Sequence, residues 1–133
     1  MSGETDIKSL LKNMTPKLND GEYVFCTLPS ITSLNPDDII GTFKEDEGWT
    51  VILNKALADK LNYKYSYVAS WMTLTIHSSL EAVGLTAAFS QALANASISC
   101  NVVAAYYHDH IFVAQQDVDK AMKVLRQLSE DNR

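Results

Sequence analysis

The chain has 133 residues, of which 47% are apolar and 20% are charged, and its formal net charge is −5 at pH 7. Its length fits one compact folding unit or two very small halves that share a core, since single cores usually comprise about 100–150 residues. The negative charge argues against nucleic acid as a partner. No run approaches the roughly 20 apolar residues that cross a bilayer, and the N-terminus lacks a signal peptide's apolar stretch. We therefore expect a cytoplasmic protein without a membrane partner.

The two cysteines, Cys26 and Cys100, are far apart in the sequence and follow no spacing typical of metal ligands. Each lies in a run with β-type patterning, where cysteine behaves as a small hydrophobic residue. We expect reduced thiols in the core, and the sequence indicates no cofactor.

The first half of the chain is predicted to have the element order α-β-β-β-α. Apolar residues at helical spacing predict a short helix over 7–14. The segment 28–37 is rich in turn formers and predicts a loop, and the turn at 45–48 ends in a glycine that suits a tight hairpin. Asn54 is expected to cap the second helix. The predicted strands are 23–28, 39–44 and 49–54.

The second half is predicted to have the order β-α-β-β-α. In its first strand, 71–76, the aliphatic side chains Met72, Leu74 and Ile76 alternate with Trp71, Thr73 and Thr75, so the aliphatic face is expected to meet helices. The opposite face is expected to contact a second subunit or the first half of the chain. The remaining predicted elements are a helix over 85–93, a hairpin of strands 98–107 and 111–113 with His108, Asp109 and His110 at its tip, and a helix over 118–128.

This order is the start of a ferredoxin-like sandwich, an antiparallel sheet with helices on one face. The local pattern LEAVGLTAAFSQAL over 80–93, followed by ASISCN over 96–101, resembles the ACT domain. In that family a glycine stands at the first strand-to-helix junction, and Gly84 occupies this place. The family's proline before that glycine is replaced by Val83.

Further motifs extend the resemblance over nearly the whole chain, to a bacterial group of short ACT-like proteins of unassigned function. These motifs are YVFC at 23–26, EGWT at 47–50, HSSLEAVGLT at 77–86 and YHDHIFV at 107–113. The resemblance implies an α+β fold of two ferredoxin-like halves, 1–66 and 67–133. The first half lacks its first helix, which the loop 28–37 replaces. No strand follows the last helix of the second half, so a strand from the first half could complete that sheet.

The junction between the strand and the helix of the second half is the candidate binding site. Free backbone N–H groups and the positive end of a helix converge there and favour a bound carboxylate. The resemblance implies that a small effector, often an amino acid, binds at this junction and against the second strand, commonly across an interface between two modules. The residues so implicated are His77, Ser78, Ser79, Leu80, Glu81, Ala82, Val83, Gly84, Leu85 and Asn101.

A purely structural role explains the same residues equally well. Ser78 and Glu81 have the spacing of a capping box, and Gly84 would then relieve a tight packing contact. We favour a helix that begins near Gly84, because this start avoids a glycine in the middle of a helix and leaves 78–83 as a loop with room for a ligand.

Two polar clusters offer alternatives. His108 and His110 have the spacing that can bind a transition metal, with His77 as a third ligand, and a small metal- or histidine-dependent enzyme is therefore a rival hypothesis. The acidic turn at 45–47 could hold a cation or an amino group, although such runs are usually solvated turns. Our leading hypothesis is a regulatory module, not an enzyme, that binds a small effector and forms a homodimer. A structural dimerisation module is the third hypothesis.

Overall fold

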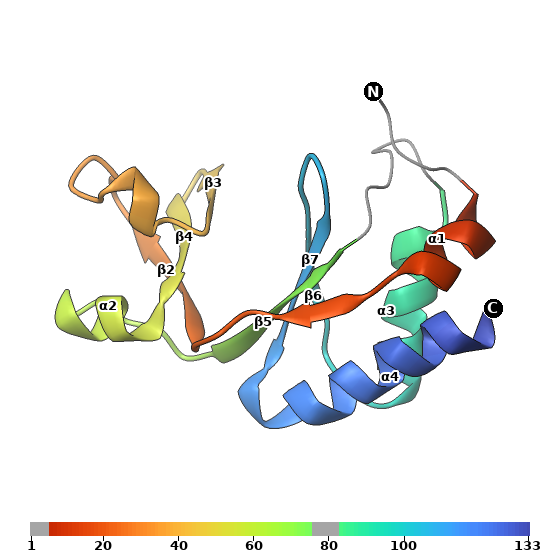
Figure 1. Ribbon diagram of the computed structural model, residues 1–133. Helices are drawn as coiled ribbons and strands as arrows, with labels where there is room; N and C mark the ends of the chain where they lie inside the picture. Colours follow the sequence, from red (N-terminus) through yellow and green to blue (C-terminus); the bar gives the residue numbers. More distant parts are fainter. Residues whose placement is uncertain (1–5, 76–82) are drawn as a thin grey trace. The chain divides into compact units, whose positions relative to one another are not determined.

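The computed structural model describes residues 6–75 and 83–133 of the chain (Figure 1). These residues form two compact units. The small unit is Asp20–Ala69, and the large unit combines the described residues of 1–19 with Ser70–Arg133. The N-terminal segment therefore belongs with the second half of the sequence. The predicted halves, 1–66 and 67–133, divide the chain close to the same boundary and remain a prediction.

The sheet of the large unit has the strand order β1-β5-β7-β6 in the described residues. Its strands are β1 (Pro16–Leu18), β5 (Val68–Leu74), β7 (Asp109–Ala114) and β6 (Asn101–Ala104). β1 pairs antiparallel with β5, with Pro16 opposite Leu74 and Leu18 opposite Met72. Counted from β5, this is the 4-1-3-2 order of a ferredoxin-like sheet. The expectation that an earlier strand completes the second half is thus confirmed, with β1 in that place.

The helices of the large unit lie next to one another and cover one face of this sheet (Figure 1). They are α1 (Ile7–Asn13), α3 (Leu85–Asn95) and α4 (Val118–Asp131). Leu10, Phe89 and Leu125 project from these helices into one core with Met72 and Leu74 of β5. The predicted alternation of β5 is therefore confirmed at both strand positions, while Ile76 lies outside the described residues. Full burial of a large apolar side chain contributes about 1.5–3 kcal/mol.

The small unit repeats the same strand order. Its elements are β2 (Tyr23–Leu28), β3 (Gly41–Glu45), β4 (Gly48–Asn54) and α2 (Lys55–Lys60), joined by the first residues of β5. β2 pairs antiparallel with β4 along its whole length. It pairs with β5 through Tyr23 opposite Ala69 and Val24 opposite Val68, which gives the order β3-β4-β2-β5. A loop with the short 3-10 helix η1 (Pro36–Asp38) replaces the first helix, as the resemblance implied.

One strand, β5, therefore serves both units. Val68 and Ala69 form the fourth strand of the small unit, and the later residues of β5 form the first strand of the large unit. The predicted fold class, two ferredoxin-like halves with antiparallel sheets, is confirmed.

Two local predictions in the small unit are confirmed at the level of single atoms. Gly48 begins β4 with φ +144°, and a Cβ atom there would lie 2.9 Å from the carbonyl oxygen of Leu28, so the turn requires glycine. Asn54 caps α2, because its side-chain oxygen accepts a hydrogen bond of 2.9 Å from the amide of Ala56.

The prediction for the second hairpin is wrong in one respect. β6 ends at Ala104, which pairs with Asp109, and the turn is closed by a 3.1 Å hydrogen bond from the amide of Ala105 to the carbonyl of His108. Asp109 and His110 therefore lie in β7 rather than at the hairpin tip, and two tyrosines of the turn are exposed instead. The polar residues suggested a turn, but cross-strand pairing sets the register here, so that the turn falls on the tyrosines.

Candidate functional site

The described part of the predicted junction is the start of α3. The helix begins at Leu85, directly after Gly84, which adopts the left-handed conformation with φ 98° and ψ −13°. The carbonyl of Gly84 accepts the first intrahelical hydrogen bond from Ala88 at 2.9 Å, and Gly84 provides no side-chain cap. Helix starts leave their first amide N–H groups for water or a ligand, and their partial positive charge favours anions.

The surroundings of Gly84 separate two explanations for the glycine. A Cβ atom at this position would lie 3.5 Å from Cγ1 of Ile7 in α1, an ordinary contact distance. The positive φ, rather than a lack of space, therefore favours glycine here. Because Gly84 is the residue before α3, a capping box at Ser78 and Glu81 does not start this helix.

The remaining predicted site residues fall into two groups. His77, Ser78, Ser79, Leu80, Glu81 and Ala82 lie outside the described residues. Val83 is 84% exposed and Leu85 is buried in the core beside α1 and α4. The junction is therefore open to solvent at Val83 and anchored at Leu85.

Asn101 is separated from this junction within one chain. It is the first residue of β6, lies opposite Phe112, and donates from Nδ2 to the carbonyl of Phe112 at 3.4 Å. Ile111 and Val113 face the helix-side core, so Phe112 and Asn101 lie on the other face of the sheet. The structure does not bring Asn101 together with Gly84 in the same chain.

Asp109 is a polar residue in the core-facing row of β7, and sequence reasoning did not select it. Its residue is 9% exposed, and it shares a strand face with Ile111 and Val113. Burial raises the pKa of its carboxyl, and the charge of His108 acts in the opposite direction. The signal available in the sequence was its spacing to two core residues, Ile111 at i+2 and Val113 at i+4.

Contacts between β5 and β7 show at which end of the sheet Asp109 lies. Trp71 stacks on Phe112, whereas Thr73, further along β5, contacts His110, which comes earlier in β7. The two strands therefore run antiparallel, and the beginning of β7 lies beside the end of β5. Asp109 is thus placed on the helix-side face, at the end of the sheet from which the chain proceeds to α3.

His110 forms a polar cluster on the opposite face. Trp71 donates its indole N–H to Nδ1 of His110 at 3.0 Å, and the Thr73 hydroxyl lies 3.1 Å from the same nitrogen. Asn19 in turn donates to the Thr73 hydroxyl at 3.0 Å. Because an indole N–H can only donate, Nδ1 carries no proton, and His110 is neutral with its proton on Nε2. Burial and then the charge of His108 lower the pKa of His110.

The metal hypothesis gains no support from this arrangement. Residues 6–75 and 83–133 contain no group of three or more histidines, cysteines, aspartates or glutamates arranged for a metal ion. Nδ1 of His110 is already engaged, and His77 lies outside the described residues. Both cysteines are free thiols, as predicted, and burial raises the pKa of Cys100 to about 11, which keeps it protonated and unreactive.

The small unit contains a separate open groove with a volume of about 540 Å³. It lies where β2 continues beyond its last residue paired with β5, Val24. Its lining residues are Phe25, Cys26, Thr27, Thr50, Lys64, Tyr65 and Ser66. Its surface is more apolar than polar, with hydroxyl groups and one lysine among the polar groups, and it is a second candidate place for a ligand.

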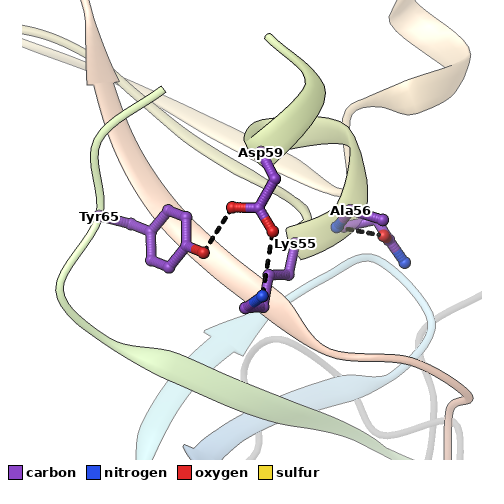
Figure 2. A network of polar contacts seen from close by, with 5 residues as sticks. Lys55, Ala56, Asp59 and Tyr65 are labelled. Carbon is purple, nitrogen blue, oxygen red and sulfur yellow. Dashed lines mark hydrogen bonds and ion pairs between the residues drawn. The ribbon is translucent and has the colours of Figure 1, made fainter. Parts of the chain in front are cut away.

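Tyr65, which lines this groove, contacts two residues of α2 (Figure 2). The Tyr65 hydroxyl donates to Oδ1 of Asp59 at 2.6 Å, and Lys55 approaches Oδ2 of the same carboxylate at 3.0 Å. The hydrogen bonds from Tyr65 and Lys55 lower the pKa of Asp59, and the bond to Asp59 raises the pKa of Lys55. Tyr65 is therefore oriented by an exposed charged pair one turn apart on α2.

The acidic hairpin turn has the properties of a solvated turn. Its acidic residues are exposed, and the Thr50 hydroxyl donates to the carboxylate of Glu45. Nothing in the described residues gathers a cation site there.

Comparison with known families decides the identity of the fold. Residues 2–70 match one model of the ACT domain, and residues 66–127 match another. The chain belongs to the ACT domain family. The two ACT matches meet at 66–70, where β5 passes from the small unit to the large unit. ACT domains are regulatory modules that bind small-molecule effectors, so the chain is a regulatory, ligand-binding type of protein.

Solved structures agree with this assignment. A Vibrio cholerae protein of unknown function, described as a possible transport protein, is 44% identical, with a TM-score of 0.82 over 92% of this chain and 94% of its own. An Agrobacterium tumefaciens protein is 17% identical, with a TM-score of 0.63 over 87% and 89% of the two chains. The ligand-free regulatory subunit of aspartate kinase from Thermus thermophilus is 9% identical, with a TM-score of 0.58 over 85% and 95%. The last two show a shared fold.

None of the curated proteins matches the sequence. In residues 6–75 and 83–133, no helix has the length and apolar character that crossing a membrane requires.

Proposed function

We propose that this ACT protein is a cytoplasmic sensor, without catalytic activity, that binds a small metabolite of the amino-acid class at the junction formed by residues 77–85. The observation that carries the proposal is the start of α3, where Gly84 turns the chain in a left-handed conformation and supplies no side-chain cap. Such a helix start offers N–H groups and a partial positive charge to a carboxylate. The solvent-exposed Val83 leaves this end of the helix accessible.

The position of Asn101 supports a site between two copies of the chain. Within one chain Asn101 lies on the sheet face away from α3. An effector at the junction that also contacts Asn101 must therefore meet the Asn101 of a second copy. A homodimer satisfies this requirement, and the ligand would then stabilise one packing of the two copies over another.

The aspartate kinase subunit that shares the fold is described as regulatory, which supports a regulatory role for this chain. Regulation requires a difference in effector affinity between two arrangements of the protein. A further protein would respond to the bound effector through the change that the effector causes at the dimer interface.

Thermal-shift measurements with the twenty L-amino acids, zinc and nickel test the proposal. A ligand that binds only the folded state stabilises it by RT ln(1 + [L]/Kd), or about 2.7 kcal/mol at 100 times Kd. We expect one or a few amino acids to raise Tm and the metals to leave it unchanged. Stabilisation by zinc or nickel alone would favour the histidine-dependent enzyme, and no stabilisation by any compound would favour a structural dimerisation module.

Gly84 provides the site-specific variant for this screen. A Gly84→Val substitution places a branched side chain at the helix start and should abolish the amino-acid shift in a protein that circular dichroism shows to be folded. Gly84→Asn is the matched control, since asparagine tolerates a left-handed backbone better than other residues. Retained stabilisation in Gly84→Val would move the site elsewhere.

A further inference from the structure

A groove open to solvent runs between α3 and α4 in the large unit. Its volume is about 450 Å³, and its surface is more apolar than polar. Three partly buried apolar residues contribute to it, Ala92 from α3 and Val124 and Leu128 from α4. Val124 and Leu128 also pack against the core of the unit. Apolar surface that stays accessible and has a polar border is typical of protein–protein contacts.

The polar border on α4 is a row of three exposed side chains with a charge of opposite sign at each end. Lys123, Gln127 and Asp131 line the groove and are four residues apart, so they follow one ridge of the helix. Lys123 and Asp131 are therefore separated by about 12 Å along the helix axis. The row begins with a positive charge and ends with a negative charge.

The two charged ends of this row have no ion-pair partner in residues 6–75 and 83–133. The ion pair found in those residues joins Lys55 and Asp59 in the small unit. Gln127 donates from Nε2 to Oδ1 of Asp131 at 2.7 Å, which orients the carboxylate along the row. A carboxylate has a second oxygen with its own lone pairs, so Oδ2 of Asp131 is suited to accept from a cation.

We propose that this groove is a contact surface for a second copy of the chain, with the two α4 helices antiparallel about a two-fold axis at Gln127. Reversing the row exchanges its ends, so Lys123 of each copy then lies opposite Asp131 of the other. A two-fold axis produces two such pairs from a single row, because the same surface patch serves both copies. The apolar residues of the groove are covered by the same residues of the second copy.

This contact goes beyond the proposed function and uses a different surface. The groove lies at the end of α3 that carries Ala92 and Asn95, whereas the proposed junction lies where the helix starts, at Leu85. α4 has 14 residues and is about 21 Å long. One pair of such helices covers less than the roughly 800 Å² per partner of a standard interface, so we expect self-association in the micromolar range.

Charge reversal in the full, ligand-free chain tests the proposed pairing. In Lys123→Glu and in Asp131→Lys, two pairs of like charges face each other, and analytical ultracentrifugation should show self-association weakened at least about tenfold. The double variant Lys123→Glu/Asp131→Lys restores opposite charges and should associate within about threefold of the wild type. Arg126→Glu makes the same charge change at an exposed position of α4 outside the groove and should associate like the wild type.

Cysteine cross-linking tests the position of the axis independently of any other contact between copies. Gln127→Cys places a thiol next to its own symmetry mate, so mild oxidation with oxidised glutathione should yield a disulfide-linked dimer. Arg126→Cys is equally exposed on the same helix and should yield far less. The native cysteines interfere little, since burial raises the pKa of both thiols.

Each contrary result has a definite meaning. A wild-type protein that is monomeric at about 100 μM would overturn the proposal, as would self-association that neither charge reversal weakens. A double variant as weak as the single variants, in a protein that circular dichroism shows to be folded, would overturn the pairing of Lys123 with Asp131. Equal cross-linking at positions 126 and 127 would overturn the axis at Gln127. None of these results affects the effector site, which the thermal-shift screen tests separately.

Discussion

Trp71 donates its indole N–H to Nδ1 of His110 across the pair of strands β5 and β7, at 3.0 Å. The contact fixes the neutral tautomer of His110 and holds the Trp71 ring against Phe112, with 6.1 Å between the ring centroids. It also explains a histidine that sequence reasoning placed at a hairpin tip as a possible metal ligand. In the structure, His110 is a satisfied polar residue on the sheet face away from the helices.

Replacing Trp71 with phenylalanine tests this relationship. The variant keeps an aromatic ring for stacking but removes the donor to Nδ1, so we expect the free energy of unfolding to fall by about 0.5–1.5 kcal/mol. The pKa of His110 should rise, because protonation of Nδ1 then no longer breaks a hydrogen bond, although the burial and the charge of His108 that lower this pKa remain. NMR titration of the His110 ring measures this pKa. An unchanged His110 pKa in the variant would contradict the assigned tautomer.

The buried carboxyl of Asp109 predicts a specific dependence of stability on pH. Burial raises its pKa in the folded protein, so the folded chain binds more protons than the unfolded chain between the ordinary and the raised pKa. Stability from this group is therefore lost as pH rises through that window. Asp109→Asn removes the effect, and its free energy of unfolding should increase relative to the wild type as pH rises above about 4, the ordinary pKa of an aspartate.

Denaturant unfolding at several pH values measures this difference in the absence of ligand. Asp119→Asn, a substitution at an exposed position of α4, is the matched control. A difference between Asp109→Asn and the wild type that shrinks as pH rises would mean that Asp109 is paired in the folded protein.

The backbone at Gly84 gives a third prediction. Alanine at φ +98° is strained, and we expect Gly84→Ala to lower the free energy of unfolding by about 1–2 kcal/mol. Gly41→Ala is the control, because a Cβ at Gly41 meets Ile52 at 3.4 Å without any left-handed strain. Chemical denaturation compares the two variants. Equal losses of stability would show that conformational strain at Gly84 is not the reason for its glycine.

The membership of the N-terminal segment in the large unit gives a fourth prediction. Leu10 is fully buried in the core with β5, α3 and α4, so Leu10→Ala should cost about 2–5 kcal/mol. Leu18 in β1 is 44% exposed, and Leu18→Ala should cost less than about 1 kcal/mol. Hydrogen exchange should show that Leu10→Ala weakens protection in α3 and α4. Weakened protection confined to the small unit would contradict the assignment.

Strong periodicity and turn chemistry made most of the fold predictable. The strand 23–28 and the cap at Asn54 agree with the sequence prediction, because aromatic and β-branched residues and a local hydrogen bond determine them. β1 was missed, since three residues that begin with a proline at the edge of a sheet carry no alternation. Its strand character depends on pairing with β5, a partner more than fifty residues away.

The candidate site was predictable only in part. The local residue types at Gly84 and Leu85 predict a strand-to-helix junction, and the structure places the helix start there. The separation of Asn101 from that start depends on which face each strand residue takes, and this follows from the register of β6 and β7. The burial of Asp109 has the same origin, because a one-residue shift in register would have exposed it.

The most direct test of the central claim is an NMR titration of the full chain with an L-amino acid that raises its Tm. The account predicts that the largest amide shifts occur at Leu85, Thr86 and Ala87, whose N–H groups form the first turn of α3. Largest shifts at Cys26, Thr27 and Lys64, which line the groove of the small unit, would contradict it and place the ligand there.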